Sequence, residues 1–154
     1  MAELCTSNKQ STIKIGIDPD LVKSGVALVK DGKLMELHAL GFPQLLEFAK
    51  AFKESAVFIV ENVEYDKTTY KRPNTTPAMM RKIAQNVGMV KGTARHLISC
   101  LEYMGCKVVK VKPLTGPVKR EAKKNADYFN KTFGWKGRTN EDKRDAALLA
   151  LSAA

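Results

Sequence analysis

The segment Thr12–Gly25 constrains the fold of this chain more than any other part of the sequence. Isoleucine occupies every second position from residue 13 to residue 17, which is the period of a β-strand. This strand, Thr12–Asp18, ends in a carboxylate and stops at Pro19, because proline cannot continue a central ladder. Ser24 and Gly25 then open a second apolar run. The segment therefore predicts an acidic group held rigidly where a core strand ends.

Hydrophobic periodicity predicts the rest of the elements. Asp31 and Gly32 form a tight-hairpin dipeptide, so the first three strands make an antiparallel meander. The continuous apolar run at 57–60 predicts a strand buried on both faces, as in a parallel region. We therefore predict an α/β fold with a mixed five-stranded sheet, three antiparallel strands plus two parallel ones, flanked by helices. The strands are expected at Thr12–Asp18, Gly25–Lys30, Lys33–Leu40, Val57–Glu61 and Cys106–Lys112, and the helices at Pro43–Lys53, Pro77–Met104, Val118–Phe133 and from residue 139 or 140 to the C-terminus.

Length and composition predict one domain in a reducing compartment. A chain of 154 residues is most simply a single domain, here 12–154, preceded by a flexible tail at 1–11. Its three cysteines have no metal-binding spacing and are expected to be reduced thiols. The chain shows no signal-peptide core and no apolar run near the roughly 20 residues of a membrane span. We therefore expect a cytoplasmic protein.

The strong positive charge favours a polyanionic partner. The net charge is +10, which points first to nucleic acid and second to an anionic membrane. Between residues 107 and 138 ten basic residues face only two acidic ones, although a solvated helix face is the plainer explanation of any single lysine. Tyrosines in the long loop 62–76 could stack on exposed bases or be incidental. The candidate DNA contacts are Lys112, Lys119, Arg120, Lys123, Lys124, Tyr65, Tyr70, Lys71 and Arg72.

Four carboxylates lie at the ends of predicted elements. Asp18 and Glu61 end two strands, and Asp142 and Asp145 open the last helix on one face. If the two strands are neighbours, both acids face the crevice beyond the carboxyl ends of the parallel strands. Hard divalent cations such as Mg²⁺ prefer such oxygen ligands, and a pair of ions can drive phosphodiester hydrolysis. The sequence therefore points to a two-metal site.

Each acid also has a simpler explanation. An acid at the end of a strand is most often a turn or cap residue. Asp142 could favour the helix dipole or join Thr139 in a capping arrangement, and Glu61 could pair with loop lysines. Only the combination of the four acids with a basic surface favours the metal site.

At these residues the chain resembles the RuvC-type Holliday junction resolvases of the RNase H-like (retroviral integrase) superfamily. The matching motifs occur in order and span nearly the whole domain. They are IGIDP at 15–19 with Ser24-Gly25, IVENV at 59–63, GMVKGTAR at 88–95, VVKVKP at 108–113 and EDKRDAALLAL at 141–151.

The resemblance implies an RNase H-like fold and metal-dependent cleavage of branched DNA, above all of four-way junctions. It implies two Mg²⁺ ions per active site, with Mn²⁺ as a substitute, and a homodimer built on the long helix 77–104. Lys112 and Lys119 would lie near the scissile phosphate. By position the metal ligands would be Asp18, Glu61, Asp142 and Asp145, with Asp18 bridging both ions and Glu141 in reserve.

The chain departs from the family pattern at three places. Asp20 replaces the usual glycine, Asn62 replaces a common glutamine, and the loop after Glu61 is longer, with Glu64 ahead of Tyr65. The short form and altered loop look more like phage-borne members, whose compartment would be the host cytoplasm. How a junction is opened, and any sequence preference, stay open.

The long helix has two stripes that bear on assembly. Its apolar stripe is wider than one small sheet can cover, and the small residues Ala84, Gly88 and Gly92 permit close approach of another element. We expect a two-fold dimer, with packing inside one chain as the alternative.

Three other functions compete with the resolvase. A non-catalytic RNase H-like module would bind nucleic acid without metal-dependent cuts. A ribonuclease for RNA–DNA hybrids would share the carboxylates but not need the long helix. An ATPase of the sugar-kinase or actin type would need two such domains, which this length does not hold.

Overall fold

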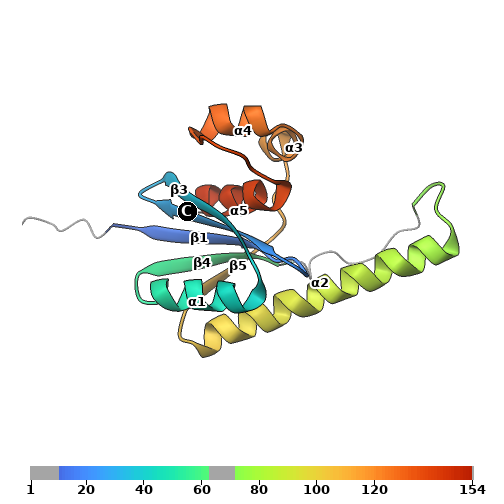
Figure 1. The fold of residues 1–154 in the computed structure, drawn as a ribbon, viewed down its shortest axis with the longest axis horizontal. Helices are drawn as coiled ribbons and strands as arrows, with labels where there is room; N and C mark the ends of the chain where they lie inside the picture. The colour runs from blue at the N-terminus through green and yellow to red at the C-terminus, as the bar shows by residue number, and fades with distance from the viewer. Residues whose placement is uncertain (1–10, 63–71, 154) are drawn as a thin grey trace, which may run out of the picture.

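A mixed five-stranded sheet forms the centre of the computed structural model, which describes residues 11–62 and 72–153 (Figure 1). The strand order is β3-β2-β1-β4-β5, with the first three strands antiparallel and with β4 and β5 parallel to β1. This confirms the predicted sheet. Apart from Ser11, the predicted tail at 1–11 lies outside the described residues. The strands are β1 Ile13–Asp18, β2 Ser24–Lys30, β3 Lys33–Leu40, β4 Ala56–Glu61 and β5 Lys107–Val111.

Helices cover both faces of the sheet, in layers that Figure 1 shows edge-on. The core between the sheet and α1 and α2 includes Ile15, Ile17, Leu45 and Leu97. On the other face lies α5, and α3 and α4 pack outside it with Phe129 in the second core. The helices are α1 Phe42–Phe52, α2 Pro77–Tyr103, α3 Pro117–Lys124, α4 Ala126–Phe133 and α5 Glu141–Ser152.

Two glycines allow α5 to lie directly on the sheet. A Cβ atom on Gly16 of β1 would come within 2.0 Å of the Ala146 carbonyl oxygen. On Gly25 of β2 it would come within 2.2 Å of the Asp142 carbonyl oxygen. Every residue from 144 to 150 is buried. The strands therefore fix both the height and the position of α5, including its acidic first turn.

The predicted basic helix Val118–Phe133 is wrong as one element, because the structure divides it at Asn125. This residue has φ −129° and ψ 103°, which is an extended conformation that no α-helix continues through. Its backbone N–H ends α3 on the Glu121 carbonyl, and its side-chain oxygen accepts a hydrogen bond from the Tyr128 N–H at 3.0 Å. Asparagine is a preferred N-cap, so one residue closes α3 and opens α4. The other predicted elements agree with the structure to within one or two residues at each end.

Among the described residues, helix α2 packs against the body of the molecule through its C-terminal half. Its buried residues are Ala94, Leu97 and Leu101, whereas the N-terminal half stands clear of the sheet (Figure 1). Thr76 caps the helix by accepting a hydrogen bond from the Met79 N–H at 3.2 Å. None of the helices in the described part of the chain has the length and apolar character to cross a membrane.

Candidate functional site

Asp18 and Glu61 lie next to each other where β1 and β4 end. The parallel register pairs Gly16 with Ile59 and Ile17 with Val60, so the following residues are Asp18 and Glu61. Side chains alternate along a strand, which places Asp18 on the same face as Gly16. That face is the one covered by α5. The prediction that Asp18 and Glu61 share a crevice required β1 and β4 to be neighbours, and the structure shows that they are.

The first turns of α5 carry the other two acids to this edge. Asn140 caps the helix, because its Oδ1 atom accepts the Lys143 N–H at 2.9 Å. Thr139 instead accepts a hydrogen bond from a buried arginine side chain. Asp142 is therefore not needed as the cap, and Asp145, one turn later, is buried. We call Asp18, Glu61, Asp142 and Asp145 the carboxylate cluster.

The pKa of Asp18 shows that the other three acids lie close to it. Burial raises the pKa of Asp18 to about 8, helped by the charges of Glu61, Asp145 and Asp142 and opposed by that of Lys119. Three carboxylates distant in the sequence are thus close enough to disfavour the ionisation of Asp18. A cation within the cluster would relieve that repulsion.

Asp20 adds a further acidic charge that sequence reasoning treated only as a turn residue. The pKa of Asp142 is raised, first by burial and then by the charges of Asp20, Glu141 and Asp145, with Lys123 acting against them. The loop that carries Asp20 is closed by its N–H, which donates to the Ser24 hydroxyl at 3.1 Å. Its position two residues after Asp18 was the signal available in the sequence.

The chemistry of the cluster fits a divalent cation, although a lysine lies within it. Carboxylate oxygens are the donors that Mg²⁺ prefers. Asp145 Oδ1 is buried and receives no hydrogen bond, and its 2.7 Å contact with Lys119 Nζ is an ion pair outside hydrogen-bonding geometry. As placed in the described residues, no three histidine, cysteine or acidic side chains converge as a ready-made metal site. The oxygens are therefore suitable, but their convergence is incomplete while Lys119 is among them.

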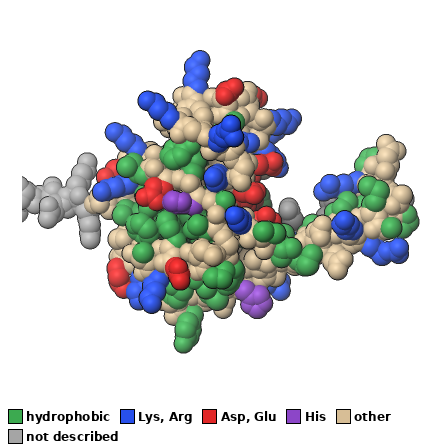
Figure 2. Space-filling view, viewed as in Figure 1, with side chains coloured by type: hydrophobic (Ala, Val, Ile, Leu, Met, Phe, Trp, Pro, Cys, Tyr) green, Lys and Arg blue, Asp and Glu red, His purple; other side chains and the backbone are tan. Residues whose placement is uncertain are grey.

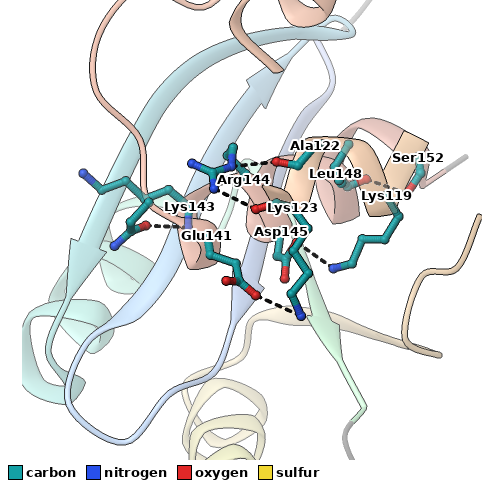
Figure 3. Close-up of polar contacts among 10 residues, drawn as sticks. Lys119, Ala122, Lys123, Glu141, Lys143, Arg144, Asp145, Leu148 and Ser152 are labelled. Atoms are coloured by element: carbon teal, nitrogen blue, oxygen red, sulfur yellow. Dashed lines mark hydrogen bonds and ion pairs between the residues drawn. The ribbon is translucent and has the colours of Figure 1, made fainter. Parts of the chain in front are cut away.

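Two ion pairs join α3 to α5 (Figure 3). Lys119 contacts Asp145 at 2.7 Å, and Lys123 contacts Glu141 at 2.9 Å. The partners are four residues apart on each helix, so they form two rungs between antiparallel helices. The pKa of Lys123 is raised chiefly by its hydrogen bond to Glu141. The basic helix is thus seated against the acidic turn.

Arg144 fixes this seating, which sequence reasoning did not foresee. The buried guanidinium donates to the Ala122 carbonyl at 2.7 Å and to the Lys123 carbonyl at 2.9 Å (Figure 3). It also donates to the Thr139 hydroxyl at 2.9 Å. The last carbonyls of a helix lack partners within it, so Arg144 satisfies the end of α3 and holds it on α5.

The other predicted DNA contacts are spread over three regions. Lys112 is exposed directly after β5, whose Val111 pairs with Glu61, and Arg120 and Lys124 are exposed on α3. Lys and Arg side chains gather around the layer of α3 and α4 (Figure 2). Arg72 is exposed in the short segment before α2, at the end of that helix away from the sheet. Tyr65, Tyr70 and Lys71 lie outside the described residues.

A basic hollow adjoins the cluster on the α2 side. It has a volume of about 210 Å³ and is lined by Glu61, Asn62 and the cationic residues Lys91, Arg95 and Lys110, among others. The two cations of α2 are four residues apart and therefore share one helix face. They belong to a motif noted in the sequence, but only the fold shows that they lie beside Glu61.

Comparison with known proteins identifies the fold. No family model and no curated protein matches the sequence. The structure of Thermus thermophilus RuvC in complex with a Holliday junction substrate matches with a TM-score of 0.57 and 19% identity, over 91% of this chain and 90% of that chain. The chain has the RuvC fold. A second Thermus thermophilus RuvC structure has a TM-score of 0.53 and 17% identity, over 91% and 92% of the two chains. The RuvC-type, RNase H-like architecture expected from the motifs is confirmed.

Proposed function

We propose that this protein is an endonuclease that cleaves Holliday junctions and other branched DNA by metal-dependent phosphodiester hydrolysis. The observation that carries the proposal is that Asp18 lies close enough to Glu61, Asp142 and Asp145 for their charges to raise its pKa, beside a basic helix whose Lys119 contacts Asp145. The RuvC fold supports it, since one matching structure is a complex with a Holliday junction substrate.

The carboxylate cluster would hold the metal. Asp18 feels the charges of all three other acids, so it is the residue we expect to contact both ions. Glu61 would complete the site from β4, and Asp142 and Asp145 from α5. When bound, two Mg²⁺ or Mn²⁺ ions supply an activated water and stabilise the leaving oxygen. Glu141 pairs with Lys123, so we assign it to the seating of α3.

Basic side chains on both sides of the cluster would hold the DNA backbone. Exposed cations on α3, such as Arg120 and Lys124, lie on one side, and Lys112 follows β5 at the edge near Glu61. The hollow with Lys91 and Arg95 lies on the other side of Glu61. Such contacts bind phosphates without reading bases, which suits an enzyme that selects a branched shape.

We also propose that α2 pairs with a second copy of the chain. A Cβ atom on Gly88 or Gly92 would meet nothing within 4 Å in the described residues, which argues against the alternative that these glycines pack inside one chain. Met79 and Met89, in the half of α2 that stands clear, are 52% and 40% exposed. A two-fold dimer would present two carboxylate clusters to a two-fold junction.

Substitution of Gly88 by arginine is expected to disrupt the dimer without harming the fold. A Cβ atom at position 88 meets nothing within 4 Å among the described residues, and arginine forms helices better than glycine by about 1 kcal/mol. A charged chain at a closely packed helix pair should weaken association by about 100-fold or more. Sedimentation or light scattering would measure this, with exposed Met35 on β3 changed to arginine as the control. An unchanged dimer in Gly88→Arg would rule out this interface.

The substrate can be identified by measuring cleavage of a four-way junction, a linear duplex, a single strand and an RNA–DNA hybrid. Each is tested with Mg²⁺ and with a chelator. We expect cleavage of the junction at least about 100-fold faster than of the duplex, because the site reads shape through the backbone. Binding of the junction without metal-dependent cuts would instead indicate a non-catalytic module. Faster cutting of the hybrid would indicate a ribonuclease and overturn the proposal.

A further inference from the structure

We propose that Lys119 is a built-in counter-ion that occupies the carboxylate cluster until divalent cations displace it toward the DNA phosphate. The inference rests on the proposed nuclease function and adds a step to it. Asp145 Oδ1 would contact Lys119 in the metal-free protein and a metal ion in the metal-bound protein.

The first support is the burial of the Lys119–Asp145 pair. Its Nζ and Oδ1 atoms are 2.7 Å apart, and the two side chains are only 17% and 10% exposed. A pair so removed from water is weakly screened, so it outweighs an exposed ion pair. Without it, Asp145 would be buried beside Asp18 with its charge unbalanced, which is costly.

The second support is that the lysine contacts a ligand atom. Asp145 Oδ1 is buried and accepts no hydrogen bond, and it is the atom that forms the ion pair with this ammonium group. A Mg²⁺ ion binds a carboxylate oxygen at roughly 2.1 Å. Two cations at one small buried oxygen would repel strongly, so a metal ion bound to Oδ1 would require the Lys119 ammonium group to move away.

The third support is that Lys119 has freedom to leave while its helix stays. Arg144 anchors the far end of α3 through the Ala122 and Lys123 carbonyls, and Lys123 is tied to Glu141. A lysine side chain is a flexible stem, so its ammonium group can swing without moving the helix. From the edge of the cluster it would reach a phosphate bound there. The same lysine would thus balance negative charge first on the carboxylates and then on the DNA phosphate.

Lys123 provides a matched comparison on the same helix. It also contacts one carboxylate of α5, but its partner is Glu141, and the two side chains are 51% and 50% exposed. Removing either lysine deletes one positive charge near the cluster. Only removal of Lys119 vacates an oxygen of the cluster itself.

The test measures Mn²⁺ binding to the whole chain without DNA, by calorimetry, for wild type, Lys119→Gln and Lys123→Gln. We expect Lys119→Gln to bind Mn²⁺ about tenfold tighter than wild type and Lys123→Gln to change by less than about twofold. Equal changes in the two variants, or weaker binding by Lys119→Gln, would overturn the inference.

A second measurement uses the unmodified protein, in case Lys119→Gln folds poorly. The rate of acetylation of Lys119, followed by mass spectrometry, should be low without metal and rise several-fold at saturating Mn²⁺, while that of exposed Lys136 stays constant. An acetylation rate of Lys119 that stays the same when Mn²⁺ binds would show that the lysine is not displaced. If Mn²⁺ binds to no form of the protein, the proposed nuclease fails instead.

Discussion

Asp18→Asn is expected to end junction cleavage and also to stabilise the metal-free protein. Burial and the charges of Glu61, Asp145 and Asp142 raise the pKa of Asp18 to about 8. The amide keeps the shape of the side chain and removes its charge, so the repulsion disappears together with a metal-binding oxygen anion. Cleavage should fall by roughly 10³-fold or more, since the proposed bridging ligand is lost. Junction binding should persist, because the basic surface is unchanged.

The gain in stability has a defined pH window. In the unfolded chain Asp18 releases its proton near the ordinary pKa of 3.8, whereas in the folded chain it keeps the proton up to about pH 8. The free energy of unfolding of the metal-free protein therefore falls as pH rises through this range. The destabilisation caused by Asp18 is complete above the folded pKa. Below both values the substitution has no charge effect. After allowance for screening, we expect Asp18→Asn to gain about 2 kcal/mol at the upper end.

Thermal unfolding in a chelator, at both ends of this pH range, measures the effect. A gain of this size corresponds to roughly 5 °C in the midpoint for a domain of this size. Asp127→Asn is the matched control, because Asp127 is exposed in the first turn of α4 and should show no such gain. A lower midpoint for Asp18→Asn at high pH, or wild-type cleavage by it, would contradict the carboxylate cluster.

Gly25→Ala is expected to reduce cleavage strongly, although Gly25 is not among the proposed metal ligands or DNA contacts. The added methyl would lie 2.2 Å from the Asp142 carbonyl oxygen and 2.9 Å from the Lys143 nitrogen. Both are backbone atoms and cannot rotate away, so the first turn of α5 must lift from the sheet. We expect a loss of about 3 kcal/mol in the free energy of unfolding. A shift of about 1 Å at the acids should reduce cleavage by roughly 10²-fold.

Gly16→Ala is the control variant. It distinguishes a general loss of stability from a displacement of the acids in the first turn of α5. Its methyl would clash with the Ala146 carbonyl at 2.0 Å, deeper along α5, so the loss of stability should be similar. Cleavage per folded molecule, measured well below both unfolding midpoints, should suffer more in Gly25→Ala. If folded Gly25→Ala cleaves at the wild-type rate, the first turn of α5 is not part of the active site.

The sheet and the neighbouring positions of Asp18 and Glu61 were accessible from the sequence for a simple reason. Alternating isoleucines give the face of β1, a continuous apolar run marks β4 as central, and acids at strand ends must share an edge if those strands pair in parallel. Each strand is identified by a local pattern in the sequence. The only further assumption was that β1 and β4 are neighbours in the sheet.

The missed features depend on contacts that no local pattern encodes. The break at Asn125 follows no proline or glycine, although an N-cap residue followed by an acid was a usable hint. Arg144 lies in a charged stretch that looks solvated, and it is buried only because the end of α3 supplies carbonyls there. The pairing of Lys119 with Asp145 likewise requires α3 and α5 to be placed in space.

The close packing of α5 on Gly16 and Gly25 also bears on when the proposed nuclease would become active. Asp18 and Glu61 are translated early, but Asp142 and Asp145 reach them only once α5 settles over Gly16 and Gly25. A nascent chain that ends before α5 would lack Asp142 and Asp145, two of the four proposed ligands. Activity would thus be withheld until folding is finished, a safeguard against unplanned cuts during biosynthesis.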